Sequence, residues 1–165
     1  MCASTALTAD DERALSEAAR VIPVLQAANL SVGVNVLLGL VRDAAARLGP
    51  AFEVEIFEAH HRAKKDAPSG TALALGRAVR DARPELHDVV GHEPGARAAT
   101  RLGYAAVRGG DVAGEHTVFF LGDGERVELT HRASTPDIFA RGALLAAAWL
   151  VGRDAGRYAM ADVLG

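Results

Sequence analysis

The sequence predicts an α+β fold, in which a mixed sheet of about four strands packs against helices. Three observations lead to this prediction. Several segments repeat apolar residues every three to four positions, as half-buried helices do. Other short segments alternate apolar and polar residues, which is typical of strands. Two alternating segments flank the turn sequence Gly-Asp-Gly-Glu at 122–125 and indicate an antiparallel hairpin.

The chain begins with a predicted helix and a short strand. Thr8 is a suitable N-cap and acidic residues follow it, so a helix is expected to run to about Arg20. Residues 21–25 are mostly apolar and predict a short buried strand. Pro23 lacks an N–H and therefore favours an edge or a bulge.

A second helix is predicted after a loop at 26–30. Ser31 can cap it, and Gly49-Pro50 can end it. Its apolar face consists of Val34, Leu37, Leu38, Val41, Ala45 and Leu48.

The centre of the chain predicts a strand, a helix, a loop and another strand. Residues 52–57 alternate apolar and acidic side chains and predict the strand. A polar loop leads to a third helix at about 71–82, which Pro84 ends. Residues 87–103 are rich in Gly, Arg and His and predict a long loop, and a short strand is expected at 104–107.

The last elements are the hairpin and a final helix. Residues 116–121 and 126–131 form the two predicted strands of the hairpin. Thr135-Pro136-Asp137 combines a cap, a proline at the first helical position and an acid in the first turn. The helix is expected to run to about Val151.

Composition narrows the function classes. The 165 residues carry a net charge of −3, which argues against a nucleic-acid-binding surface. The single cysteine, Cys2, allows no intrachain disulfide, as in a reducing compartment. We find neither an apolar stretch long enough to cross a membrane nor a signal-peptide pattern. A cytoplasmic protein without nucleic-acid or membrane partners is therefore expected.

The polar segment 58–71 lies between the end of a predicted strand and the start of a helix. Ser69, Gly70 and Thr71 place backbone N–H groups and hydroxyls at the positive end of that helix, an arrangement that favours anions. Lys64, one of only two lysines, adds a positive charge. His60 and His61 can give or take a proton near neutral pH. The segment predicts a site for a small carboxylate or phosphate with proton transfer beside it.

Each feature of this segment also has a structural explanation. A Ser-Gly-Thr helix start is often only a cap, and adjacent histidines or lysines are often solvated. Consecutive residues on a strand point to opposite faces, so His60 and His61 do not easily hold one metal ion. We therefore predict no metal site, and a metal hydrolase is a distant alternative. The conjunction of these features favours a functional site.

Four stretches resemble the 4-hydroxy-tetrahydrodipicolinate reductase (dihydrodipicolinate reductase) family. The most specific is Glu58-Ala-His-His-x-x-Lys-x-Asp-Ala-Pro-Ser-Gly-Thr71. The others are Asn29-Leu-Ser-Val-Gly-Val-Asn35, Arg108-Gly-Gly-Asp-Val-Ala-Gly-Glu-His-Thr117 and Leu129-Thr-His-Arg-Ala-Ser134. The resemblance extends over almost the whole chain, from about residue 3.

This resemblance implies an activity and roles for individual residues. The family reduces a cyclic imine-derived dicarboxylate with NADH or NADPH in lysine and diaminopimelate biosynthesis, and it forms homotetramers through the sheets of its substrate domain. By their positions in the motif, His60 resembles the proton donor and Lys64 a second catalytic residue that also contacts substrate. The substrate carboxylates would be held by His61, Ser69, Gly70 and Thr71.

The resemblance also implies three regions. Residues 30–135 correspond to the substrate-binding and oligomerisation domain. Residues 1–29 and 136–165 resemble only the last strand, helix and tail of the family's Rossmann-type nucleotide-binding domain. The family's Gly-rich phosphate turn between a strand and a helix has no counterpart in this sequence. A partner chain or an upstream segment would have to supply the rest of that domain.

The cofactor side departs from the family pattern. Ala3-Ser4-Thr5-Ala6 stands where the family has Gly-Thr-Thr-Gly against the nicotinamide, so Ala3, Ser4 and Thr5 form a degraded cofactor contact. Asn29 and Leu30 complete it. Pro136 stands where the family usually has an arginine near the cofactor.

Two functional hypotheses follow. The chain is the substrate-binding portion of a reductase, or it is a non-catalytic binding or oligomerisation protein that kept the same fold. In both cases the final helix would expose apolar residues, including Leu144, Leu145, Trp149 and Leu150, and association into oligomers or poor solubility is expected.

Overall fold

A computed structural model describes residues 1–4, 7–92 and 94–165. The chain divides into two compact units. The first comprises Met1–Val36 and Pro136–Gly165, and the second comprises Leu37–Thr135. The functional division predicted at 1–29, 30–135 and 136–165 stays a prediction. No helix within the described residues is long and apolar enough to cross a membrane.

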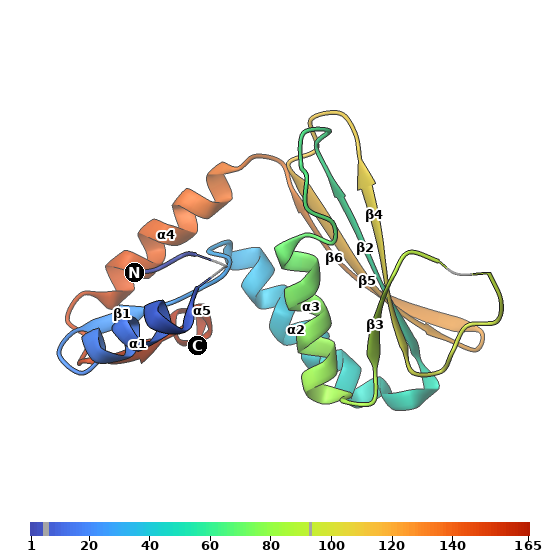
Figure 1. Cartoon of the computed structure of the whole chain (residues 1–165), viewed down its shortest axis with the longest axis horizontal. Helices are drawn as coiled ribbons and strands as arrows, with labels where there is room; N and C mark the ends of the chain where they lie inside the picture. Colours follow the sequence, from blue (N-terminus) through green and yellow to red (C-terminus); the bar gives the residue numbers. More distant parts are fainter. Residues whose placement is uncertain (5–6, 93) are drawn as a thin grey trace. The chain divides into compact units, whose positions relative to one another are not determined.

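The second unit is built on a five-stranded mixed sheet with the order β3-β4-β2-β5-β6 (Figure 1). Strands β3, β4 and β2 are parallel, whereas β5 pairs antiparallel with both β2 and β6. The strands span β2 Glu53–His60, β3 His87–Val90, β4 Arg101–Arg108, β5 Gly114–Gly122 and β6 Glu125–Ala133. The α+β class and the predicted hairpin are confirmed.

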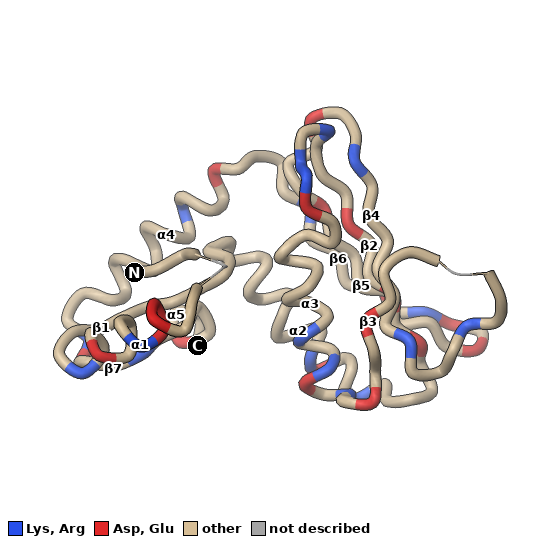
Figure 2. Tube along the Cα trace, in the orientation of Figure 1, with Lys and Arg blue, Asp and Glu red and all other residues tan. Residues whose placement is uncertain are grey.

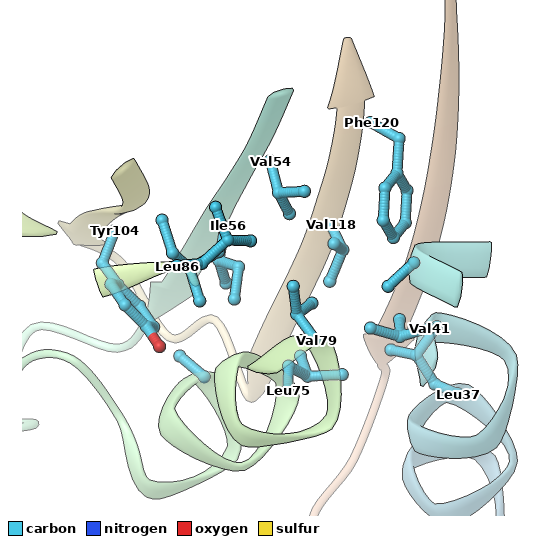
Figure 3. Packing of buried hydrophobic residues seen from close by; sticks show 13 residues of the cluster. Leu37, Val41, Val54, Ile56, Leu75, Val79, Leu86, Tyr104, Val118 and Phe120 are labelled. Atoms are coloured by element: carbon cyan, nitrogen blue, oxygen red, sulfur yellow. The ribbon is translucent and has the colours of Figure 1, made fainter. Parts of the chain in front are cut away.

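Two helices cover one face of this sheet. They are α2 (Val32–Leu48), whose residues from Leu37 onward belong to this unit, and α3 (Gly70–Ala82). Figure 3 shows their apolar side chains meeting those of the strands. Each of these large side chains contributes roughly 1.5–3 kcal/mol by leaving water. The buried cluster is Leu37, Val41, Ala45, Val54, Ile56, Ala72, Leu75, Val79, Leu86, Leu102, Tyr104, Val118 and Phe120.

The inward-facing side chains of β2 change from apolar to polar along the strand. Val54 and Ile56 face the helices and are fully buried. Because side chains repeat every second residue on a strand, Glu58 and His60 lie on the same face and are also buried. The inward face of one strand is therefore apolar at its start and polar at its end.

The sequence predicted a loop where β3 lies, so the prediction of four strands was wrong by one. β3 has only four residues and pairs with β4 alone, at the edge of the sheet. Its first two residues, His87 and Asp88, are exposed and polar, so no alternation marks the strand. Long-range contacts hold it instead, because Asp88 accepts a hydrogen bond from buried Tyr104 at 2.9 Å and pairs with Arg80.

The first unit is smaller and contains a parallel two-stranded sheet, β1-β7. Its core joins Leu25, Leu30, Ala146 and Met160. The elements are α1 Ala9–Ala18, β1 Pro23–Leu25, α4 Asp137–Leu150, β7 Gly156–Tyr158 and α5 Met160–Leu164, together with the first residues of α2. That this unit is a remnant of a Rossmann-type domain stays a prediction.

Several boundaries in this unit are narrower than predicted. Thr8 caps α1 through a capping box with Asp11, as the sequence indicated. Strand β1 begins at Pro23, since Val21 and Ile22 are exposed residues of the preceding turn. Helix α4 begins at Asp137, one residue after the predicted proline start.

Helix α4 carries charged side chains only at Asp137 and Arg141, and Figure 2 shows that most of it lacks charge. Leu144 is 72% exposed and Leu145 is also exposed, as expected. Trp149 and Leu150 are half-buried, because Leu150 packs against the core of this unit and Trp149 contacts the ring of Tyr158.

Candidate active site

The candidate site lies in the second unit, where β2 and β4 end and α3 begins. The sheet register places His60 opposite Arg108 on β4, and Glu58 opposite His116 on β5. Three neighbouring strands thus bring these four side chains to one place. Figure 2 shows basic and acidic residues close together at this end of β2 and β4.

Glu58 is the centre of the cluster and is only 1% exposed. Arg108 binds it with two nitrogens, Nη1 to Oε2 at 2.8 Å and Nη2 to Oε1 at 2.6 Å. The backbone N–H of Ser69 donates to Oε1 at 3.1 Å, and His60 Nδ1 lies 2.5 Å from Oε2. Burial raises the pKa of Glu58, but the hydrogen bonds from Arg108 and His60 outweigh it and hold the pKa below its ordinary value. Glu58 is therefore ionised at neutral pH.

His60 presents its two ring nitrogens to different surroundings. Nδ1 faces Glu58, whereas Nε2 lies 3.1 Å from the place where a Cβ would stand on Gly114. The missing side chain at Gly114 leaves space beside Nε2. Burial lowers the pKa of His60, and the neighbouring Glu58 only partly offsets this. The ring is therefore mostly neutral at pH 7 and can take up a proton when negative charge arrives.

Ser69 joins the start of α3 to this cluster. Its hydroxyl accepts from the N–H of Ala72 at 3.2 Å and caps the helix, as predicted. The same hydroxyl lies 3.0 Å from His116 Nε2, and the ring of His116 contacts that of His60 edge to face. Burial lowers the pKa of His116 to about 4, so this ring is neutral.

Two buried nitrogens at the site lack a hydrogen-bond partner among the described residues. They are His116 Nδ1 and Arg108 Nε. An unsatisfied buried polar atom costs about 1–3 kcal/mol and is uncommon in folded proteins. A polar ligand or water would relieve this cost.

The remaining predicted substrate residues border the cluster. Lys64 is half-buried and its Nζ donates to Asp66 at 2.9 Å. Gly70 and Thr71 form the first two positions of α3, and a Cβ on Gly70 would meet no atom within 4 Å. The space in front of this helix end is therefore open. His61 is exposed, and its carbonyl accepts from the N–H of Lys64.

The predicted cofactor residues belong to the first unit. Ala3 and Ser4 are exposed, and Thr5 lies outside the described residues. Asn29 orients the start of α2, because its Oδ1 accepts from the N–H of Ser31 at 2.8 Å. Leu30 is buried in the core of that unit, so its side chain has a packing role.

Three side chains have the right donors for a metal ion. Ligand atoms of Glu58, His60 and His116 lie within 4.8 Å of one another. However, both Glu58 oxygens already accept from the Arg108 guanidinium, whose charge opposes a cation at this place. The absence of a metal stays a prediction, which metal analysis of the purified protein tests.

Glu58, Arg108 and His116 lie within the sequence motifs, but the sequence alone assigns none of them a role. The position of Glu58 could have been predicted to matter, because it shares the inward face of β2 with Val54 and Ile56. A buried carboxylate there needs hydrogen-bond or ion-pair partners. Arg108 and His116 had no such signal, since only the pairing of β4 and β5 with β2 brings them near.

Comparisons with known proteins show the family to which the chain belongs. Residues 33–164 match the family model described as dihydrodipicolinate reductase, C-terminus. The fold resembles a dipicolinate-bound dihydrodipicolinate reductase from Paenisporosarcina sp. TG-14, with a TM-score of 0.74 over 94% of this chain and 60% of that one, at 24% identity. The chain belongs to the dihydrodipicolinate reductase C-terminal family.

Similar curated relatives are named more specifically. Proteins called 4-hydroxy-tetrahydrodipicolinate reductase from Myxococcus xanthus and Zymomonas mobilis are 52% and 53% identical to it, each over 98% of this chain. This chain covers 61% and 66% of their respective lengths. It therefore spans less than two thirds of the relatives it matches.

Proposed function

We propose that this chain is the substrate-binding portion of a 4-hydroxy-tetrahydrodipicolinate reductase of lysine and diaminopimelate biosynthesis. It would bind a small cyclic dicarboxylate and provide the acid for its reduction. The observation that carries the proposal is the buried Glu58 carboxylate, which bonds both to His60 and to the N–H of Ser69 at the start of α3. One group thus connects a proton donor to a helix terminus that favours anions.

The residues of the chain would divide the work as follows. Lys64 would exchange its partner Asp66 for one substrate carboxylate, and the first turn of α3 at Gly70 and Thr71 would receive the other. The two negative charges would favour protonation of His60. Its Nε2, beside the space at Gly114, would then be the atom that gives a proton to the reduced substrate. His61 would contact a substrate carboxylate from the exposed rim of the site.

The reaction needs a hydride, which NADH or NADPH supplies in the family. The first unit does not fit such a dinucleotide by itself. The segments that lead from a strand into a helix in this unit, residues 26–31 and Ala159, contain no glycine, whereas a pyrophosphate-binding turn between a strand and a helix requires glycines. We therefore propose that residues outside 1–165, on the same chain or on a partner, bind the dinucleotide. Ala3, Ser4, Thr5, Asn29 and Leu30 would at most border it.

Calorimetric titration with pyridine-2,6-dicarboxylate tests the substrate site. The Lys64→Ala variant should bind at least about tenfold more weakly than the wild type, because a charge-assisted hydrogen bond is lost. The matched control is Lys65→Ala, which removes the neighbouring exposed lysine and should leave binding unchanged. Equal binding by wild type and Lys64→Ala, or no binding by either, would contradict the assignment.

A non-catalytic binding or oligomerisation protein is the second candidate, favoured by the glycine-free start of the first unit. A steady-state assay of the chain alone with NADPH and the family's substrate tests the non-catalytic candidate. Turnover would exclude the non-catalytic candidate. Only weak turnover or none is expected without the dinucleotide-binding residues. A cytoplasmic location is part of the proposal, since Cys2 is a free thiol.

A further inference from the structure

Glu58 is shared by three segments of the second unit. Its Oε2 lies 2.5 Å from Nδ1 of the His60 ring on its own strand, and its Oε1 accepts from the backbone N–H of Ser69 and from Arg108 at the end of β4. We propose that Glu58 is a positioning residue with two roles. It fixes the His60 ring as the Nδ1–H tautomer, and it holds the first turn of α3 in place beside that ring. The role of His60 as a proton donor rests on the proposed function, but the tautomer and the contacts of Glu58 can be tested without a ligand.

The tautomer follows from the donors around the carboxylate. Glu58 is ionised and offers only acceptors, so the short contact of 2.5 Å requires a hydrogen on His60 Nδ1. In the neutral ring, Nε2 then carries the lone pair. That nitrogen faces the space beside Gly114, where a proton must arrive before it can be donated. The opposite tautomer would leave Nε2 already protonated and Nδ1 facing the carboxylate with its lone pair.

Arg108 keeps the carboxylate in one orientation. Its two nitrogens bind the two oxygens of Glu58, and Nη2 also donates to the backbone carbonyl of Asp66 at 2.7 Å. The guanidinium therefore fixes the loop before α3 as well as the acid. Because Ser69 N and Arg108 both contact Oε1, rotation of the carboxylate would break contacts to both segments.

Substitution by glutamine should invert the tautomer. The side chain of Glu58→Gln has one oxygen and one NH₂ group. The oxygen should take the place of Oε1, where Arg108 Nη2 and Ser69 N both donate, because the NH₂ group cannot accept from either; the bond from Arg108 Nη1 to Oε2 is then lost. The NH₂ group would then face His60 Nδ1, which must become the acceptor, so that the hydrogen moves to Nε2.

The experiment is long-range ¹H–¹⁵N NMR of the histidine rings in the ligand-free protein at a pH where they are neutral. The wild type should show Nδ1–H for His60, and Glu58→Gln should show mainly Nε2–H together with a shifted Ser69 amide. Glu55→Gln is the matched control, since Glu55 lies on the same strand and also pairs with arginine, but on the other face. It should leave the His60 signals unchanged.

Two outcomes overturn the inference: a wild-type His60 with Nε2–H, or Glu58→Gln with the wild-type tautomer and Ser69 shift. If Glu58→Gln fails to fold, Glu58→Asp keeps the charge but withdraws it from Nδ1, and it should mix the two tautomers; an unmixed Nδ1–H form there would also overturn the inference. Titration of the wild type with pyridine-2,6-dicarboxylate is read separately. Its failure counts against the proposed function, while the tautomer still decides the role of Glu58.

Discussion

Glu58 and His116 show how single residues at the site are constrained by burial. Both are nearly inaccessible, yet one is kept charged by Arg108 and the other is kept neutral by burial. Removing one partner of a buried ion pair typically costs about 3–5 kcal/mol, because the other charge is left uncompensated. Arg108→Ala should therefore disturb this cluster far more than loss of an exposed ion pair.

His116 should make the protein less stable in mild acid. Its pKa is about 4 when folded, below the ordinary 6.5, so the unfolded chain binds a proton first as the pH falls. Stability is full above about pH 6.5 and is lost progressively toward pH 4, by on the order of 3 kcal/mol. Urea unfolding of wild type and His116→Gln between these pH values measures it. An equal pH dependence in both proteins would contradict the prediction.

His60 should make dicarboxylate binding depend on pH near neutrality. Its pKa in the free protein is below 6.5, and a bound dianion favours the protonated ring. Binding therefore takes up a proton, and affinity should rise as the pH falls from about 8 toward 6. Calorimetry in buffers of different ionisation enthalpy reports the proton. In His60→Gln the uptake should shrink, and unchanged uptake in that variant would refute the role of His60.

Among the helices and strands, those whose formation depends on a local sequence pattern could be predicted from the sequence. The helices and the hairpin follow from periodicity and turn residues, and Ser69 caps α3 as expected. Strand β3 was missed because its stability comes from pairing with β4 and from the Tyr104–Asp88 contact, neither of which is local. The same reason explains why Arg108 and His116 were not assigned to the site.

Two helical glycines should respond to alanine in opposite ways. A Cβ on Gly76 of α3 would lie 1.7 Å from the Tyr104 hydroxyl, which is buried and holds Asp88 of β3. Gly76→Ala should therefore destabilise the protein by about 1–3 kcal/mol. A Cβ on Gly39 of α2 meets nothing within 4 Å, so Gly39→Ala should stabilise it by about 0.5–1 kcal/mol. Urea unfolding compares them, and equal effects would contradict this packing.

For the whole molecule, the exposed apolar residues of the first unit bear on association. Leu144, Leu145 and Val151 are exposed on or just after α4, together with Val21 and Ile22. We propose that the chain assembles, as a homotetramer or with a chain that supplies the dinucleotide-binding residues. Light scattering of the purified chain should show an oligomer, and Leu144→Glu should reduce its mass. A monodisperse monomer would contradict the proposal.

The dicarboxylate site itself is tested most directly by titrating the ¹⁵N-labelled chain with pyridine-2,6-dicarboxylate and recording amide NMR spectra. The largest shifts should fall on residues 58–71 and on Arg108 and His116, with Gly70 and Thr71 among the strongest because they form the open end of α3. Shifts concentrated in the first unit, or no shifts at millimolar ligand, would contradict a substrate site at the start of α3.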